Sequence, residues 1–210
     1  MKKKKLLIGG GIAFVLIGII LISIPVYMKY KADKIEGKMI SDFKASISST
    51  KQMNHKADSK SNKKVETGKT GNSTDNDERV FADPYNTIAL VEIPAIQLEA
   101  PVVNGQNNLN YTIGKYTNGV DFGGYGNVIL AGHNDMGGSI FRDLRYLDKG
   151  DVVTIVTKTG KFKYQVYGKT VVLPTEVSVL DSDPTVQELT LITCTDRAKK
   201  RVIIKCHLIK

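Results

Sequence analysis

Residues 188–194 read ELTLITC, an apolar segment with alternating polar positions that ends in a cysteine. Alternation of this kind is typical of a β-strand with one buried face. The polar residues 195–200 follow at once, so Cys194 lies where the strand gives way to a loop. A thiol at a strand end is accessible to a substrate, and Cys194 is therefore a candidate catalytic residue.

Two further strands carry chemically useful residues at their ends. Residues 128–133 read VILAGH, an apolar strand that ends in His133. Residues 201–209 read RVIIKCHLI, a strand that opens with Arg201. Because Cys194 and these two residues occupy the same kind of position, we predict that the three form one site.

Residues 81–210 as a whole indicate a mainly β fold. Short apolar runs recur there between turn residues, and they read NTIALVEIP, QLEAPVV, GNVILAG, DVVTIVT, KFKYQVYGKTVVL, ELTLIT and RVIIKCHLI. Seven or eight strands in about 130 residues favour a closed β-barrel or a sandwich. One helix is predicted over residues 139–147, with Ser139 as its cap and a buried stripe of Ile140, Phe141, Leu144 and Leu147.

The amino-terminal residues have the pattern of a membrane anchor. Residues 2–5 are lysines, and residues 6–28 contain no charged side chain. A helix over residues 6–28 would extend about 34 Å, enough to cross a hydrocarbon core of about 30 Å. A cleaved signal peptide is the alternative, but its apolar region is about 7 to 15 residues long. We therefore predict a transmembrane anchor over residues 6–28, with residues 1–5 as a cytoplasmic basic tail.

Residues 29–80, between the predicted anchor and the predicted barrel, are rich in Lys, Ser, Asn, Asp and Thr. Such a segment buries too little apolar surface to offset its ordering entropy, so most of it is predicted to be a flexible tether. A short helix over residues 29–47 is compatible with the apolar residues that recur loosely there. The catalytic domain is then expected over residues 81–210.

The formal net charge of +9 is concentrated in the first part of the chain. Residues 1–80 carry 16 Lys and Arg against 8 Asp and Glu, whereas residues 81–210 carry 14 against 13. A nucleic-acid-binding protein needs a basic face on its folded domain. The distribution therefore argues against a nucleic-acid partner and favours contact of the tether with anionic lipid or wall polymer.

The last two strands are predicted to form a hairpin. A six-residue loop makes Cys194 and Arg201 direct cross-strand partners, which point to the same face. Arg197 lies in the loop without this constraint, so Arg201 is the stronger candidate. The same register puts Cys206 opposite Leu189, roughly 17 Å along the strand from Cys194 and well beyond the ~7 Å limit for a disulfide. Both thiols are therefore predicted to be free.

A catalytic thiol needs help from its neighbours. The unperturbed pKa of cysteine is about 8.5, so a nucleophilic cysteine needs a group that takes its proton. His133 is the candidate for this role, because His55 lies in the tether and His207 lies inside the last strand. Amide transfer also needs stabilisation of the developing oxyanion, for which Arg201 is the candidate.

The motifs LAGH at residues 130–133 and TLITC at residues 190–194, with the strand-opening Arg201, resemble those of the sortases. Sortases are cysteine transpeptidases that attach proteins to the Gram-positive cell wall. The resemblance covers about residues 84–210 and implies a closed sortase-type β-barrel of about eight strands. The predicted amino-terminal anchor, with no second span after Lys210 and no long insertion before Glu188, resembles the class A or class D groups.

Carried over residue by residue, the resemblance implies Cys194 as nucleophile, His133 as general acid and base, and Arg201 as the stabilising cation. The implied reaction cleaves an LPXTG-like sorting signal between Thr and Gly through a Cys194 thioester. An amine of a peptidoglycan precursor then resolves the thioester, and no diffusible cofactor is required. The implied location is the cell membrane, with a single span and an extracellular catalytic domain.

Some class A sortases bind an activating calcium ion through carboxylates before the AGH strand and before the TLxTC strand. In this chain residues 116–127 read YTNGVDFGGYGN, with Asp121 as the one carboxylate, and Asp181 and Asp183 lie in the second region. Calcium favours about six to eight oxygen ligands, several of them charged. We therefore predict no metal site and no dependence on calcium.

Two other functions stay open. Another envelope cysteine hydrolase is one, although an L,D-transpeptidase places its histidine and cysteine close together near an SxGC run. Here 61 positions (194 − 133) separate His133 from Cys194. The papain type has its cysteine before its histidine, which is the reverse order. An anchored, non-catalytic binding module is the other function, and the joint presence of Cys194, His133 and Arg201 argues against it.

Overall fold

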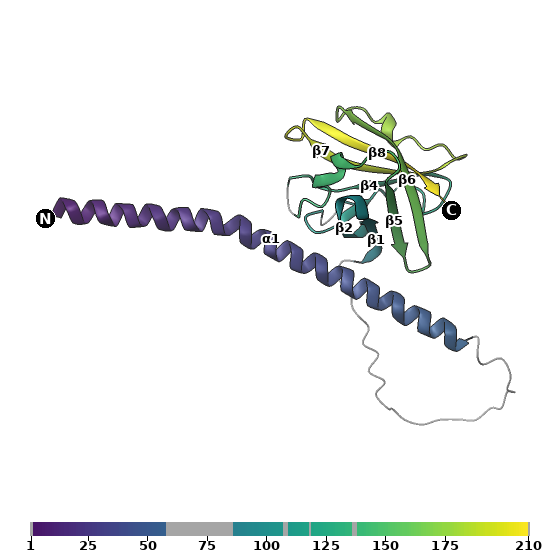
Figure 1. Cartoon of the computed structure of the whole chain (residues 1–210), viewed down its shortest axis with the longest axis horizontal. Helices are drawn as coiled ribbons and strands as arrows, with labels where there is room; N and C mark the ends of the chain where they lie inside the picture. Colours follow the sequence, from purple (N-terminus) through teal and green to yellow (C-terminus); the bar gives the residue numbers. More distant parts are fainter. Residues whose placement is uncertain (1, 58–85, 107–108, 118, 136–137, 210) are drawn as a thin grey trace, which may run out of the picture.

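The computed structural model describes residues 2–57, 86–106, 109–117, 119–135 and 138–209. A long helix, α1 (Lys2–Ala57), is followed by a closed barrel of eight strands (Figure 1). The strands are β1 (Thr87–Ile93), β2 (Leu98–Asn104), β3 (Ile113–Lys115), β4 (Gly126–Ala131), β5 (Val152–Thr157), β6 (Lys161–Val172), β7 (Gln187–Thr195) and β8 (Lys200–Ile209). The predicted mainly β barrel of about eight strands is confirmed, with the short β3 as the strand that the apolar runs did not show.

The strand order around the barrel is β1-β2-β3-β4-β7-β8-β6-β5, and β5 closes on β1. Most neighbours are antiparallel, but β2 pairs with β3 and β4 pairs with β7 in parallel. Parallel strands end at the same edge of a sheet. The carboxyl ends of β4 and β7 therefore lie side by side; β7 carries the predicted cysteine, and the predicted histidine follows two residues after the end of β4.

The barrel interior is apolar because alternate side chains of each strand point inward. In β7, Leu189 and Leu191 are fully buried in the core, and in β6 so are Tyr164 and Val166. The hydroxyl of Tyr164 accepts a hydrogen bond from the backbone N–H of Gly123 at 2.8 Å, which satisfies this polar group inside the core. The alternate positions of β7 point outward and form the face on which the site lies; these are Glu188, Thr190, Ile192 and Cys194.

The helix predicted over residues 139–147 is shorter and of another type. Only η2 (Arg142–Tyr146) is helical, as a 3-10 helix. Ser139 has a left-handed backbone (φ 52°), and the N-cap position of the 3-10 helix is occupied by Phe141, which makes no side-chain cap. The predicted apolar residues Ile140, Phe141, Leu144 and Leu147 are nevertheless all buried in the core. Two further 3-10 turns are η1 (Pro94–Ile96) and η3 (Ser178–Leu180).

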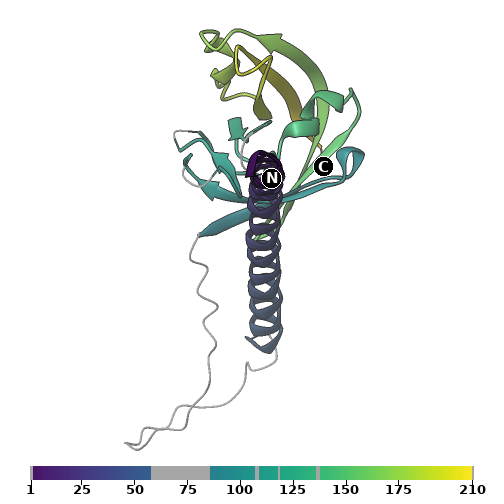
Figure 2. The same cartoon turned by 90° about the vertical axis from the view of Figure 1, so that its left-hand side faces the viewer.

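Helix α1 extends further than predicted. Residues 29–57, assigned to a mostly flexible tether with a short helix over residues 29–47, are helical up to Ala57. One reason is tertiary packing: Phe43 lies against Leu90 of β1 and Val156 of β5 on the outer face of the barrel. Lys44 adds an ion pair with Glu99 of β2. In Figures 1 and 2 this part of α1 runs along the barrel, while its amino-terminal part projects away.

The part of the predicted tether at residues 58–80 lies outside the described residues. In the portion of the chain that the structure describes, no helix is both long and apolar enough to cross a membrane. The transmembrane span predicted over residues 6–28 is therefore not supported.

Candidate functional site

The parallel pair of β4 and β7 sets the position of His133. Ala131 is the register partner of Ile192, and the backbone N–H of Gly132 donates to the Ile192 carbonyl at 3.1 Å. Continuing this register by two residues brings His133 level with Cys194. The two predicted residues therefore leave adjacent strands at the same height.

The antiparallel hairpin of β7 and β8 sets the position of Arg201. Cys194 and Arg201 are direct cross-strand partners, as predicted, and Thr195 pairs with Lys200. The loop between the two strands is therefore two residues shorter than the six-residue loop that was predicted. The same register pairs Cys206 with Leu189, and both cysteines are free, so these two predictions are also confirmed.

The loop that joins β7 to β8 is a left-handed turn. Asp196, Arg197 and Ala198 have φ values of 52°, 51° and 66°, which residues with a Cβ adopt only at a cost in free energy. The guanidinium of Arg201 contacts this turn, because its Nη1 donates to the Ala198 carbonyl at 2.8 Å and to the Lys200 carbonyl at 3.0 Å. Both N–H groups of Nη1 are thus used, and the donors on Nη2 and Nε remain for a ligand.

Three contacts hold the backbone that carries His133. The buried hydroxyl of Thr193 donates to the Gly132 carbonyl at 2.8 Å, and the N–H of Phe141 donates to the His133 carbonyl at 2.9 Å. Gly132 is required for close packing, since a Cβ there would lie 2.8 Å from the Phe141 ring. The AGH motif is therefore explained by packing of Phe141 on Gly132 as well as by the histidine.

The two cysteines differ in their capacity to react. Cys194 is half-buried at the strand end, as are His133 and Arg201. Cys206 is fully buried, and burial together with the Glu188 charge raises the pKa of its thiol to about 12. The thiolate is the reactive form of cysteine, so Cys206 is unreactive at neutral pH.

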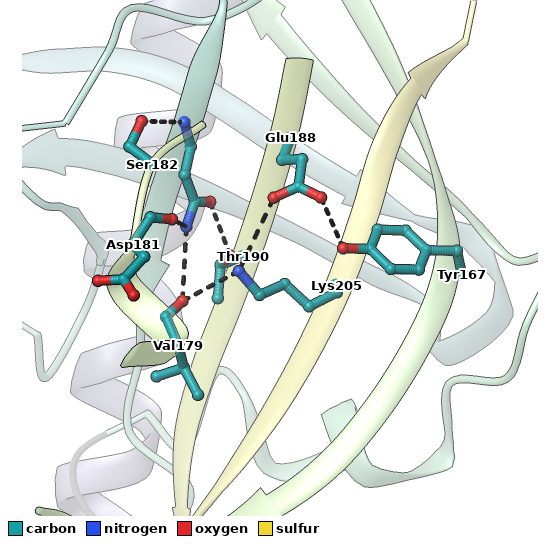
Figure 3. A network of polar contacts seen from close by, with 8 residues as sticks. Tyr167, Val179, Asp181, Ser182, Glu188, Thr190 and Lys205 are labelled. Atoms are coloured by element: carbon teal, nitrogen blue, oxygen red, sulfur yellow. Dashed lines mark hydrogen bonds and ion pairs between the residues drawn. The ribbon is translucent and has the colours of Figure 1, made fainter. Parts of the chain in front are cut away.

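A polar network on the outer face of the sheet, the face that also carries Cys194, was not predicted from the sequence (Figure 3). Lys205 of β8 and Asn127 of β4 bond to the connection between β6 and β7, and Tyr167 donates to Glu188 at 2.6 Å. Polar residues at outward-facing positions of apolar strands were the available signal. The sequence did not show which groups these polar residues contact, because the connection between β6 and β7 carries no recognisable motif.

The residues near the β3–β4 connection do not fit a calcium ion. The Asp121 side chain is fully exposed, and its Oδ1 lies 3.9 Å from the Lys115 ammonium. Asp183 accepts hydrogen bonds from the N–H and the hydroxyl of Thr185, which lower the pKa of its carboxyl. Among the described residues, no three His, Cys, Asp or Glu side chains are grouped so as to hold a metal ion.

Comparisons with known proteins agree with this geometry. The model of the Sortase domain family matches residues 91–209. Sortase D of Bacillus subtilis is 30% identical over 152 residues, covering 68% of this chain and 75% of the relative. Sortase A of Streptococcus agalactiae is 33% identical over 128 residues, which cover 57% of this chain and only about half (52%) of that relative.

A solved structure gives the same result for the fold. The structure of a Clostridium perfringens sortase D5 transpeptidase superposes with a TM-score of 0.62 at 26% identity. The superposition covers 84% of this chain and 99% of that chain. The family model matches more than half of the chain and includes Cys194, His133 and Arg201. The chain belongs to the sortase family, whose members are cysteine transpeptidases.

Proposed function

We propose that this protein cleaves an LPXTG-like sorting signal between Thr and Gly. It then joins the threonine carbonyl carbon to an amine of a peptidoglycan precursor. The observation that carries the proposal is the direct pairing of Cys194 with Arg201 at the end of β7, beside the strand that leads to His133. Family membership supports the substrate class. The setting is then the cell envelope, with the barrel on the extracellular side.

In the proposed acylation step, the Cys194 sulfur attacks the threonine carbonyl and forms a thioester as the bond to the glycine nitrogen breaks. His133 takes the thiol proton as the sulfur attacks and then gives a proton to the leaving amine. Arg201 donates from Nη2 or Nε to the oxygen on which negative charge develops. Its Nη1 stays on the loop carbonyls, which keeps the guanidinium in place during the reaction.

In the proposed second step, the acceptor amine attacks the thioester carbonyl while His133 takes its proton. The tetrahedral intermediate again places its negative oxygen beside Arg201. Collapse forms a new amide and expels the Cys194 sulfur, which takes the proton back from His133. Atoms balance without a cofactor, because the amide that is cleaved is replaced by the amide that is made.

The test is covalent labelling with a thiol-reactive LPXTG-like peptide, followed by mass spectrometry. The wild type and the Cys206→Ala variant should each gain one adduct, since Cys206 is buried. Cys194→Ala should gain none, and His133→Ala should transfer about 10² to 10⁴-fold more slowly. A wild type without an adduct would favour a non-catalytic binding module, and an adduct on Cys194→Ala would contradict the assignment of the nucleophile.

A further inference from the structure

We propose that a pocket at the end of the barrel opposite Cys194 binds a small amphipathic anion, with its carboxylate on Lys115 and its apolar body against aromatic side chains. The pocket has a volume of about 430 Å³, which is in the range of small-molecule sites. The proposed transfer reaction does not use this pocket. Its ligand is therefore independent of the proposed function.

The pocket and the catalytic residues lie at opposite ends of β8 (Figure 1). The hairpin between β5 and β6 supplies part of the lining of the pocket. Lys163, just after that hairpin, pairs with Ile209 at the carboxyl end of β8, whereas Arg201 lies near the amino end of this strand. Eight positions (209 − 201) separate the two ends, which is about 26 Å along the strand. A small ligand in the pocket therefore does not contact Cys194.

Lys115 brings a buried positive charge to the pocket. Its side chain is only 7% exposed, and it lines the pocket from the end of β3. The Lys115 ammonium lies 3.9 Å from Asp121 Oδ1, too far for a hydrogen bond, and 5.7 Å from the centre of the Phe122 ring. Among the described residues, no acceptor forms a hydrogen bond with this ammonium. An ammonium has three donors, and a buried ammonium that lacks acceptors favours an anionic ligand.

Apolar side chains form the other walls of the pocket. Ile88, Phe122 and Phe162 line it, and each packs against the barrel core. The Gly123 backbone lies against the Phe162 ring with no room for a Cβ, and the Gly123 N–H donates to the Tyr164 hydroxyl at 2.8 Å. These contacts hold the neighbouring Phe122 in place. A preformed apolar wall favours a ligand with a hydrocarbon or aromatic body.

The charges around the pocket favour an anion over a cation. Two ammonium groups, those of Lys115 and Lys158, line the pocket with one carboxylate, that of Asp121. Because the Asp121 side chain is fully exposed, water screens its charge more than it screens the charge of the buried Lys115. Lys158 is exposed at the rim, where its ammonium lies 6.0 Å from the Phe43 ring of α1. A cation or a metal ion would be repelled by both lysines.

The charge of the ligand follows from the same residues. One buried ammonium balances one negative charge, whereas a phosphate dianion would leave a second charge uncompensated near Asp121. The fitting ligand is therefore a monoanion, and a carboxylate can accept hydrogen bonds from the Lys115 ammonium through both of its oxygens. Its apolar body would lie between the aromatic rings that line the pocket.

Phenylbutyrate is a probe of this chemistry, and phenylbutyramide is its uncharged counterpart. Each is titrated into the isotope-labelled full chain, and the amide chemical shifts of Lys115, Phe122 and Gly123 give a dissociation constant for the pocket. The acid should bind at least about tenfold more tightly than the amide, because a hydrogen bond to a charged group contributes about that factor. Equal affinities, or shifts confined to other parts of the barrel, would overturn the proposal.

Three variants test the role of Lys115. Lys115→Met keeps the apolar stem, so it should weaken phenylbutyrate binding at least about tenfold and change phenylbutyramide binding by less than about twofold. Asp121→Asn should tighten phenylbutyrate binding by about two- to fivefold, since it removes a competing carboxylate. Lys163→Met is the matched control, because Lys163 is an exposed lysine outside the pocket, and it should have little effect. Undiminished binding to Lys115→Met, or an equal loss in Lys163→Met, would show that this ammonium does not hold the anion.

Two measurements separate this pocket from the proposed active site. Cys194→Ala should bind phenylbutyrate with unchanged affinity, and an LPXTG-like peptide should not displace the acid. Displacement by the peptide would place the probe in the donor site and would overturn a separate pocket. A wild type that forms no thioester yet binds phenylbutyrate through Lys115 would end the proposed function alone.

Discussion

Cys194 and Arg201 face each other directly across the β7–β8 hairpin, and Arg201 is anchored to the turn of that hairpin by its Nη1. The neighbouring Arg197 is exposed within the turn and is not one of the paired residues of β7 and β8. The register of the hairpin therefore makes Arg201, and not Arg197, the cross-strand partner of Cys194.

Arg201→Ala should lower the rate of transfer by about 10² to 10³-fold, because it removes a donor to the developing oxyanion. Arg197→Ala should change the rate by less than about threefold, since its side chain lies in solvent beyond the strand ends. Initial rates with an LPXTG-like peptide and an amine acceptor measure both. A larger loss for Arg197→Ala would show that Arg201 is not the stabilising cation.

Gly132→Ala should destabilise the barrel by about 1–3 kcal/mol, because the added Cβ would lie 2.8 Å from the Phe141 ring in a packed core. Thermal or urea unfolding measures the change. Gly160→Ala is the matched control, since a Cβ at Gly160 meets nothing within 4 Å. Equal stability of the two variants would mean that the Phe141 ring moves aside at little cost.

Attachment of α1 to the barrel should weaken as pH rises from about 4.5 to about 7. Burial, and then the Asp33 charge, raise the pKa of Glu36 from 4.5 to about 7. The folded state therefore binds this proton more tightly than the unfolded state, and its contribution to stability is complete below pH 4.5 and lost above pH 7. Hydrogen exchange of α1 amides around residue 36, corrected for the intrinsic pH dependence of exchange, measures the effect.

The Glu36→Gln variant should remove this pH dependence, because glutamine does not titrate. Asp33→Asn should only weaken it, since burial is the larger cause. A pH profile that is the same in Glu36→Gln and in the wild type would contradict the assignment to Glu36.

Transfer should not depend on calcium. Asp121 is the one carboxylate of residues 116–127, it is fully exposed, and it lies beside the Lys115 ammonium. Such a site gives a weak field for an ion that favours about six to eight oxygen ligands. Initial rates in chelator and in millimolar calcium should agree. A several-fold rise with calcium that disappears in Asp121→Ala would contradict the prediction.

The barrel and the hairpin were predictable because their signals are local. Alternation marks the inward residues of β6 and β7, and a short loop between β7 and β8 leaves few registers for Cys194 and Arg201. For His133 the signals were its place at a strand end and the family resemblance, because the parallel pairing of β4 with β7 joins segments that are far apart in the sequence. Nothing in the local pattern specifies which strands become neighbours.

The features that were missed depend on tertiary packing. Helix α1 extends beyond its predicted end, and Phe43 meets Leu90 and Val156 on the outside of the barrel, where a strand pattern predicts solvent. The helix predicted to start at Ser139 fails because that residue adopts a left-handed backbone. The contact of Lys205 with the Val179 carbonyl depends on the path of the long connection between β6 and β7, which no motif reveals.

The place of β7 between β4 and β8 also determines when the site can exist during folding. The hairpin with β8 closes a short loop and can form early, whereas pairing with β4 must bring together residues 61 positions apart (194 − 133). Contacts of large sequence separation carry a higher entropy of closure and form slowly. A newly made chain therefore carries Cys194 without His133 beside it until the barrel closes, so the proposed reactivity of the thiol depends on the completed barrel.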